Sequence, residues 1–384
     1  MLQYLPATVV QRYTMVWAMG SMSAAHIYRM MTDYGGWSLD FTGPLMIIVQ
    51  KVTLVAFALH DGKGRSDSSL NQDQREQKID VCPSPLEYFT YIFNFHSFLA
   101  GPSFSIKDFL AFMDGSNLKT KEHVREPSAT FAIVSKFVYS LVSLFFWIYL
   151  GLHYTPQMTY DPQYSTLGRL YIVFFYGLVF RLKYYFLWYL VDSVNNTCGL
   201  GFSGYDTLGQ PKWDLVSDIN FAEIEAAPNI RALSTYWHAT AGKWLRRVCY
   251  ERVTFSPTYT SFIMSAWWHG FYPGYFFMFL SFAVAAEAAR KMRRLIRPHF
   301  QSSLPLKWSY DVLTIVATHL CMDYCQLPIA YLWLSPSLQF YSYFYFIPNI
   351  VILLVALLLP AGKSSRQTGK LSDKTLTEAK SKEH

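Results

Sequence analysis

Residues 261–279 read S-F-I-M-S-A-W-W-H-G-F-Y-P-G-Y-F-F-M-F, an apolar and aromatic run with one ionisable side chain, His269, in its middle. The run approaches the roughly 20 mostly apolar residues that a membrane-spanning helix needs. Gly270, Pro273 and Gly274 follow the histidine, and we expect them to loosen or kink the helix there. An ionisable group at such a place marks a candidate functional site. The alternative is a neutral histidine that is hydrogen-bonded inside a helix bundle.

The composition of the whole chain agrees with a membrane protein. Of the 384 residues, 52% are hydrophobic and only 15% are charged, whereas soluble domains carry about 25% charged residues. The apolar residues are also gathered into long segments instead of showing amphipathic periodicity throughout. We therefore expect one polytopic domain and no separate soluble domain.

Apolar segments of near-spanning length recur along the chain, separated by short polar loops. Besides 261–279, they are residues 2–31, 41–59, 131–152, 167–191, 308–333 and 340–359. Residues 83–113 are apolar but broken, which is typical of a re-entrant or interfacial piece. The fold class predicted is all-α, a transmembrane helical bundle with re-entrant and interfacial helices. It comprises residues 1–362, and the polar tail at 363–384 is predicted to be disordered and cytosolic.

Two charged stretches are not expected to belong to a site. Residues 63–80 are the most hydrophilic internal segment, and their mixed charges favour a solvated loop. Arg181 and Lys183 interrupt the apolar segment 167–191, and their long stems allow the charges to extend to the membrane interface.

Several kinds of site are not indicated. The ten histidines include no pair spaced i, i+3 or i, i+4, and the five cysteines form no C-x-x-C motif, so no metal site is expected. The chain contains no P-loop, no dinucleotide-binding fingerprint after a strand and no nucleic-acid-binding module. The net charge of +7 is concentrated in loops and in the tail, where it suits anionic headgroups. We therefore predict no bound cofactor and no nucleic-acid partner.

A second histidine, His238, lies close to a basic cluster that contains Arg246 and Arg247. The spacing of tryptophans and arginines from Trp237 onward suits a helix along the membrane surface, aromatic on one side and basic on the other. Its basic face is suited to phosphates of an anionic cosubstrate, or else to lipid headgroups. His238 itself can be a functional residue or a surface histidine.

Without a metal, a histidine buried in the membrane is suited to acid–base chemistry near neutral pH. Such a residue can remove a proton from a hydroxyl group as its oxygen attacks an activated acyl group. A second polar side chain would orient the histidine or donate to the developing oxyanion. Because the sequence has no G-x-S-x-G nucleophile elbow, we expect direct transfer without an acyl-enzyme.

Several sequence blocks, taken together, resemble the membrane-bound O-acyltransferase family in its lysophospholipid acyltransferase branch. The blocks are DFTGPLM at 40–46, HDG at 60–62, LAGP at 99–102, GFSGYD at 201–206, VCYERV at 248–253 and WHGFYPGY at 268–275. The last block is highly specific, and the resemblance extends over nearly the whole chain. It is closest to enzymes that use lysophosphatidylethanolamine, lysophosphatidylserine or lysophosphatidylcholine.

The resemblance implies a multi-pass enzyme of the endoplasmic reticulum in which His269 is the catalytic base. A helical chamber would receive acyl-CoA, a cosubstrate, from the cytosol and lysophospholipid from the bilayer. The C-terminal K-x-K-x-x pattern is similar to endoplasmic reticulum retrieval signals. The resemblance adds Trp268, Asn195, Asn196 and Asp206 as candidate substrate-binding residues. For the last three, cap or turn roles are the alternative.

Two departures from the family pattern stand out. Position 238 is usually asparagine in this branch, so the second catalytic role falls on a histidine with additional protonation states. Family members also carry membrane spans before the part that matches Leu2, and we expect this chain to lack them. The function predicted is re-esterification of lysophospholipid in phospholipid remodelling. The alternatives are transfer to a neutral lipid or a protein, and an inactive short isoform that binds lipid or acts as a scaffold. The oligomeric state is left open.

Overall fold

The computed structural model of the chain describes residues 4–36, 40–119 and 127–360. The tail predicted to be disordered and the retrieval-like pattern therefore lie outside the described residues. The first half contains α1 (Val10–Thr32), α2 (Thr42–Lys63), η1 (Asp67–Ser69), α3 (Gln72–Gln77), α4 (Pro85–Ile92), α5 (Phe95–Phe98), α6 (Ile106–Met113), η2 (Ser116–Leu118), α7 (Thr130–Gly151), η3 (Pro156–Tyr160) and α8 (Thr166–Thr197). The segment predicted to be broken, 83–113, is indeed three short helices, α4 to α6.

The second half begins with a small hairpin, in which β1 (Gly204–Tyr205) pairs antiparallel with β2 (Pro211–Lys212). The remaining elements are α9 (Phe221–Glu225), α10 (Ile230–Tyr236), α11 (Ala239–Leu245), the π-helical η4 (Arg246–Tyr250), α12 (Pro257–His269), α13 (Pro273–Ile296), η5 (Arg297–Phe300), α14 (Leu304–Tyr331), α15 (Leu334–Ser342) and α16 (Ile347–Leu358). The part of the chain that the structure describes is thus all-α apart from this hairpin, as predicted.

Four helices of the described part are long and apolar enough to cross a membrane, namely α2, α7, α8 and α14. The pair α15 and α16 would make a fifth span, although the two helices are bent by 88°. The apolar segment predicted at 340–359 therefore corresponds to a broken span or a re-entrant loop, since the chain turns sharply between the two helices. The protein is a multi-pass membrane protein of the class that the composition indicated.

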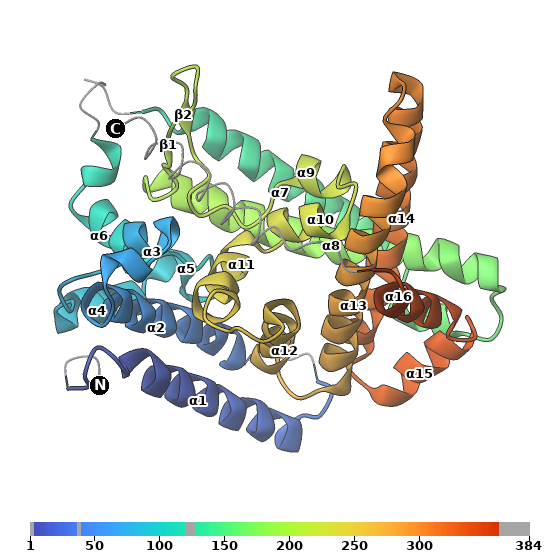
Figure 1. Cartoon of the computed structure of the whole chain (residues 1–384), viewed down its shortest axis with the longest axis horizontal. Coiled ribbons are helices and arrows are strands. Elements are labelled where there is room, and N and C mark those ends of the chain that lie inside the picture. Colours follow the sequence, from blue (N-terminus) through green and yellow to red (C-terminus); the bar gives the residue numbers. More distant parts are fainter. Residues whose placement is uncertain (1–3, 37–39, 120–126, 361–384) are drawn as a thin grey trace, which may run out of the picture.

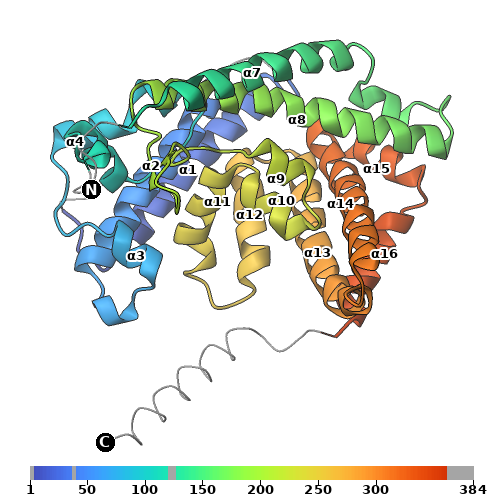
Figure 2. The same ribbon diagram turned by 90° about the horizontal axis from the view of Figure 1, so that it is seen from above.

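The long helices α7 and α8 run side by side (Figures 1 and 2), and in Figure 2 they lie along one face with the other helices beneath them. Two serine hydroxyls help to join this pair. Ser140 on α7 donates to the carbonyl of Phe186, and Ser193 on α8 donates to the carbonyl of Ile133, at 2.9 and 3.0 Å. Interhelical hydrogen bonds of small residues are a usual means of packing helices in a bilayer.

One charge inside the bundle, that of Arg181, is paired with acids. Arg181 on α8 is buried and its guanidinium contacts Asp323 on α14 at 2.5 Å and Glu225 on α9 at 2.9 Å. The expectation that Arg181 extends its charge to the membrane interface is therefore wrong. The carboxylates allow the charge to remain inside, since intramembrane ionisable groups are tolerated when they pair with one another.

The segment α11–α12 lies in the middle of the molecule, between α1 to α3 on one side and α13 to α16 on the other, in both views (Figures 1 and 2). A hydrophobic cluster that includes Met22, Trp244 and Trp268 joins α1, α2, η4, α11 and α12. The site at residues 238–270 is thus held on several sides by helices that are distant in sequence.

Candidate functional site

The run around His269 is not one kinked helix. Instead, α12 ends at His269, and α13 begins at Pro273. Gly270 between them has φ 126° and ψ −167°, a conformation that is essentially restricted to glycine. Gly274 then brings the start of α13 against α14, because a Cβ at this position would lie 2.0 Å from the carbonyl oxygen of Pro328. The break places His269 at a helix end, in the centre of the bundle.

His269 is oriented by its own helix and by aromatic rings. Its Nδ1 lies 2.8 Å from the carbonyl oxygen of Ser265. A carbonyl only accepts hydrogen bonds, so Nδ1 carries the hydrogen and Nε2 keeps its lone pair. Rings of Trp268, Tyr275 and Phe279 lie around the imidazole, with centroids 4.7, 5.7 and 4.8 Å away. The geometry therefore leaves Nε2 as the basic nitrogen.

His238 and His269 meet at the same indole ring. The centroid of the His238 ring lies 6.1 Å from that of Trp268, which in turn is 4.7 Å from that of His269. The Trp268 indole is fixed by a hydrogen bond from its Nε1 to the carbonyl of Met46 at 3.1 Å. The structure thus brings together three of the residues that the sequence singled out, from two different segments.

His238 adopts a left-handed backbone conformation, with φ 49° and ψ 51°, just before α11. Among non-glycine residues, asparagine, aspartate and histidine are enriched in this region. Its ring stacks on Trp188 of α8 at a centroid distance of 4.6 Å, and its Nδ1 lies 3.2 Å from Oδ1 of Asp218. Position 238 is therefore fixed in backbone, ring plane and hydrogen bonding.

Asp218 is a buried carboxylate that the sequence analysis did not single out. Burial by itself raises the pKa of this carboxyl group, but the neighbouring His238 and hydrogen bonds from Thr240 lower the pKa below its usual value. The interaction spans 20 residues of sequence. Asp218 lies in irregular chain before α9, and nothing in its local sequence signals this contact.

His26 on α1 is a further histidine at the site. Its Nε2 lies 3.1 Å from the carbonyl oxygen of Trp268, and its Nδ1 lies 3.2 Å from where a Cβ of Gly270 would be. His26 is buried on α1, a mostly apolar helix that also carries Arg12 and Arg29. An ionisable group in an apolar segment is a candidate functional residue, and this signal could have found His26.

A cavity of about 330 Å³ adjoins this centre. Its lining includes Asp73, Ser103, Thr240, Lys243, Arg246 and Arg247. Trp244 also lines the cavity, and its ring centroid is 5.5 Å from that of Trp268. Trp244 and Trp268 therefore lie between this part of the cavity wall and the two histidines. Lys243 lies one helical turn before Arg246, and this spacing is visible in the sequence itself.

The two arginines predicted to meet phosphates differ in their surroundings. Arg247 makes two hydrogen bonds to Asp73 on α3, at 2.8 and 2.7 Å. Arg246 is mostly exposed and contacts Glu251 at 2.7 Å. Burial raises the pKa of Asp73, but Arg247, Arg246 and Lys243 together lower it below its usual value. Lys243 and Arg246 are exposed and line the cavity, so their positive charges are accessible from solvent and from the cavity.

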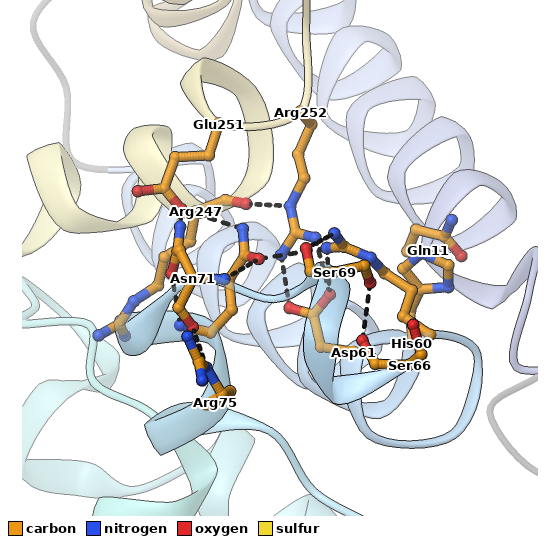
Figure 3. A network of polar contacts seen from close by, with 12 residues as sticks. Gln11, His60, Asp61, Ser66, Ser69, Asn71, Arg75, Arg247, Glu251 and Arg252 are labelled. Atoms are coloured by element: carbon orange, nitrogen blue, oxygen red, sulfur yellow. Dashed lines mark hydrogen bonds and ion pairs between the residues drawn. The ribbon is translucent and has the colours of Figure 1, made fainter. Parts of the chain in front are cut away.

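A polar network joins η4 and the two residues after it to the end of α2 and to the hydrophilic segment that follows α2 (Figure 3). Arg252 makes two hydrogen bonds to Asp61, at 2.7 and 2.6 Å, and Asn71 donates to Glu251 at 2.8 Å. The prediction of a solvated loop at 63–80 is therefore incomplete, since the segment forms α3 and packs against the basic helix. It positions the basic wall of the cavity.

Asn195, Asn196 and Asp206 lie in local structural settings. Asn195 and Asn196 are buried at the end of α8, and the Oδ1 of Asn196 would lie 1.7 Å from a Cβ at Gly201. Asp206 accepts hydrogen bonds from the backbone of Leu208 and Gln210, which closes the turn of the β1–β2 hairpin. Asp206 thus has the turn role that was its alternative. Oδ1 of Asn195 and both polar side-chain atoms of Asn196 are buried without a hydrogen-bond partner, so these contacts show no cap role for the two asparagines. A part in substrate binding stays a prediction for all three residues.

No group of three or more His, Cys, Asp or Glu side chains in the described ranges is arranged to hold a metal ion.

Comparison with known proteins shows which family the chain belongs to. The sequence profile of the membrane-bound O-acyltransferase family matches residues 26–325. The chain belongs to this family. Mouse membrane-bound glycerophospholipid O-acyltransferase 2 is 38% identical over 97% of this chain and 74% of its own length. The human membrane-bound glycerophospholipid O-acyltransferase 1 is 38% identical over 91% of this chain and 74% of its own length. Lysophospholipid acyltransferase 6 of Drosophila melanogaster is 39% identical over 92% of this chain and 51% of its own length.

The family assignment confirms the resemblance inferred from the sequence blocks. The matched region contains both histidines, Trp268 and the basic wall of the cavity. The membrane-bound O-acyltransferase assignment also agrees with the helical, multi-pass structure.

Proposed function

We propose that this protein transfers an acyl group from acyl-CoA to the free hydroxyl of a lysophospholipid, in the remodelling of membrane phospholipids. The observation that carries the proposal is the meeting of His238 and His269 on the Trp268 indole, next to a cavity with a basic wall. The names of the relatives, glycerophospholipid and lysophospholipid acyltransferases, support this substrate class. The acceptors proposed are lysophosphatidylethanolamine, lysophosphatidylserine and lysophosphatidylcholine.

In this proposal His269 is the general base. Its Nδ1 hydrogen is committed to the Ser265 carbonyl, so Nε2 is available to accept the proton of the lipid hydroxyl. The hydroxyl oxygen attacks the thioester carbonyl carbon, the C–O bond forms and the C–S bond breaks. The thiolate that leaves takes the proton that His269 received, which gives free CoA and a diacyl phospholipid.

His238 supports the same step by donating to the thioester oxygen or by orienting the thioester. Negative charge develops on the carbonyl oxygen during the attack, and a fixed donor there lowers the barrier. The stacking on Trp188 and the contact with Asp218 hold the imidazole in one orientation, which such a donor requires.

The cavity accommodates part of the CoA moiety. Lys243 and Arg246 offer exposed positive charge to its phosphates, and the hydroxyls of Ser103 and Thr240 line the same space. Arg247 is held by Asp73 and serves to build the wall. The positive-inside rule and the basic cluster at 290–297 are consistent with CoA entry from the cytosol, in the endoplasmic reticulum membrane.

The acceptor is tested with microsomes that contain the protein, labelled acyl-CoA and a panel of acceptors. The panel holds lysophospholipids with different headgroups, a neutral lipid and a peptide. Labelled diacyl phospholipid is the expected product. A labelled neutral lipid or peptide in its place would make the acceptor assignment wrong.

His269→Ala separates an enzyme from an inactive lipid-binding or scaffold protein. We expect activity to fall by about 10²–10⁴-fold, the usual contribution of a general base. His299→Ala is a control, because His299 lies in η5 and not in α12. Microsomal activity or cellular function that is unchanged in His269→Ala would contradict the catalytic interpretation.

A further inference from the structure

The contact between Asp218 and His238 is one of several that join this acid to the segment that carries His238. Oδ1 of Asp218 lies 3.2 Å from Nδ1 of His238, and it also accepts hydrogen bonds from the backbone and the hydroxyl of Thr240, at 2.9 and 2.6 Å. The carbonyl of Asp218 accepts a bond from the Ala239 nitrogen at 2.9 Å. Four contacts therefore hold one carboxylate residue to the short segment that carries His238.

This geometry determines which nitrogen of His238 faces a substrate. An ionised carboxylate is an acceptor only, so the hydrogen of Nδ1 points to Asp218. The ring cannot turn freely, because it stacks on Trp188 with an interplanar angle of 19°. The backbone of His238 is also fixed in the left-handed region. Nε2 is then the nitrogen left for the substrate.

An amide and an imidazole differ in what they need to be a donor. The side-chain nitrogen of asparagine always carries hydrogens, whereas Nε2 of this histidine carries one only when the ring is doubly protonated. The ring lies between Trp188 and Trp268, and the carboxylate of Asp218 lies within hydrogen-bonding distance of it, so a negative charge faces Nδ1.

On the basis of the proposed function, we infer that Asp218 is a positioning residue for acyl transfer. Asp218 orients the His238 ring and supplies the counter-charge, so that the Nε2–H group of His238 donates to the thioester oxygen. As the lipid oxygen bonds to the carbonyl carbon, the π electron pair moves onto the carbonyl oxygen, next to Nε2–H. When that pair returns, the C–S electrons leave with sulfur, which takes the proton held by His269. The pair of His238 and Asp218 ends the step unchanged.

A double-mutant cycle tests this inference on the whole chain in microsomes. The four proteins are the parent, Asp218→Asn, His238→Asn and the double variant, each normalised to the amount of folded protein by fluorescence-detected size exclusion. Asparagine at 218 keeps an acceptor oxygen for Thr240, so the cap of α11 is retained. The kcat and the KM for acyl-CoA are measured separately.

We expect Asp218→Asn to lower kcat about 10–100-fold in the parent and to change the KM by less than about threefold. A loss of this size is usual when a residue that orients a functional group is replaced. In the His238→Asn background the same change should lower kcat less than about threefold, because an amide donor does not need the carboxylate. Asp61→Asn is the matched control. Asp61 is a buried acid paired with Arg252 at 2.6 Å, and its effect should be equal in both backgrounds.

Two results would overturn the inference. One is an equal loss from Asp218→Asn in both backgrounds, which is the behaviour of a purely structural residue. The other is full kcat in Asp218→Asn with His238 present. A parent protein without acyl transfer would overturn the proposed function as well, whereas an active parent with equal losses would overturn this inference alone.

Discussion

Gly270→Ala tests whether the break between α12 and α13 is the feature that sets the site. Gly270 has φ 126° and ψ −167°, and an L-residue there is strained by on the order of 1–3 kcal/mol. The added methyl would also lie 3.2 Å from Nδ1 of His26 and 3.4 Å from the ring of Tyr275. Both side chains belong to the centre that surrounds His269, so neither can withdraw without moving it.

The assay is thermal unfolding in detergent, followed by tryptophan fluorescence, with acyl transfer measured in parallel. At roughly 1 °C of Tm for each kcal/mol in a chain of this size, we expect the Tm to fall by about 1–4 °C. Acyl transfer should fall more than the folded fraction does, because the strain acts on the backbone next to His269.

Gly20→Ala is the matched control for this change. Gly20 lies within α1, is exposed, and has no atom within 4 Å of the place that an alanine methyl would take. Alanine is favoured over glycine in a helix by about 1 kcal/mol, so its Tm should be equal or slightly higher. The reasoning is refuted if Gly270→Ala unfolds at the Tm of the parent, or if both variants lose the same stability.

Three further predictions concern the second histidine, the cavity wall and the buried ion pair. His238→Asn should keep activity within about fivefold of the parent and His238→Ala should lose at least about 20-fold, since only the first keeps a donor; equal activity of all three would remove His238 from the mechanism. Arg246→Ala should raise the KM for acyl-CoA about fivefold, because about one charge-assisted hydrogen bond is lost. The KM for acyl-pantetheine should stay unchanged. A rise for both thioesters would contradict the phosphate contact. Gly177→Ala would put a methyl 2.1 Å from the carboxyl carbon of Asp323 and separate it from Arg181, so size exclusion should show little folded protein. A monodisperse peak equal to that of the parent would count against this packing.

The sequence by itself determined the class of the protein. Length and apolar content of a segment are local properties, so the spans at α2, α7, α8 and α14 could be predicted closely. The block at 268–275 identified the family and selected His269. The glycines and proline after His269 indicated a disturbed helix, although not that the chain leaves the helix altogether.

Only the tertiary structure decided which groups meet. Asp218 and His238 are 20 residues apart, Arg247 and Asp73 are 174 apart, and His26 contacts a carbonyl 242 residues away. Arg181 stays inside the bundle because Asp323, 142 residues later, reaches it. Such pairs depend on how whole helices pack, and no local pattern of apolar or charged residues encodes that packing. The residue types at the site were therefore readable from the sequence, whereas their hydrogen-bond partners were fixed by the fold.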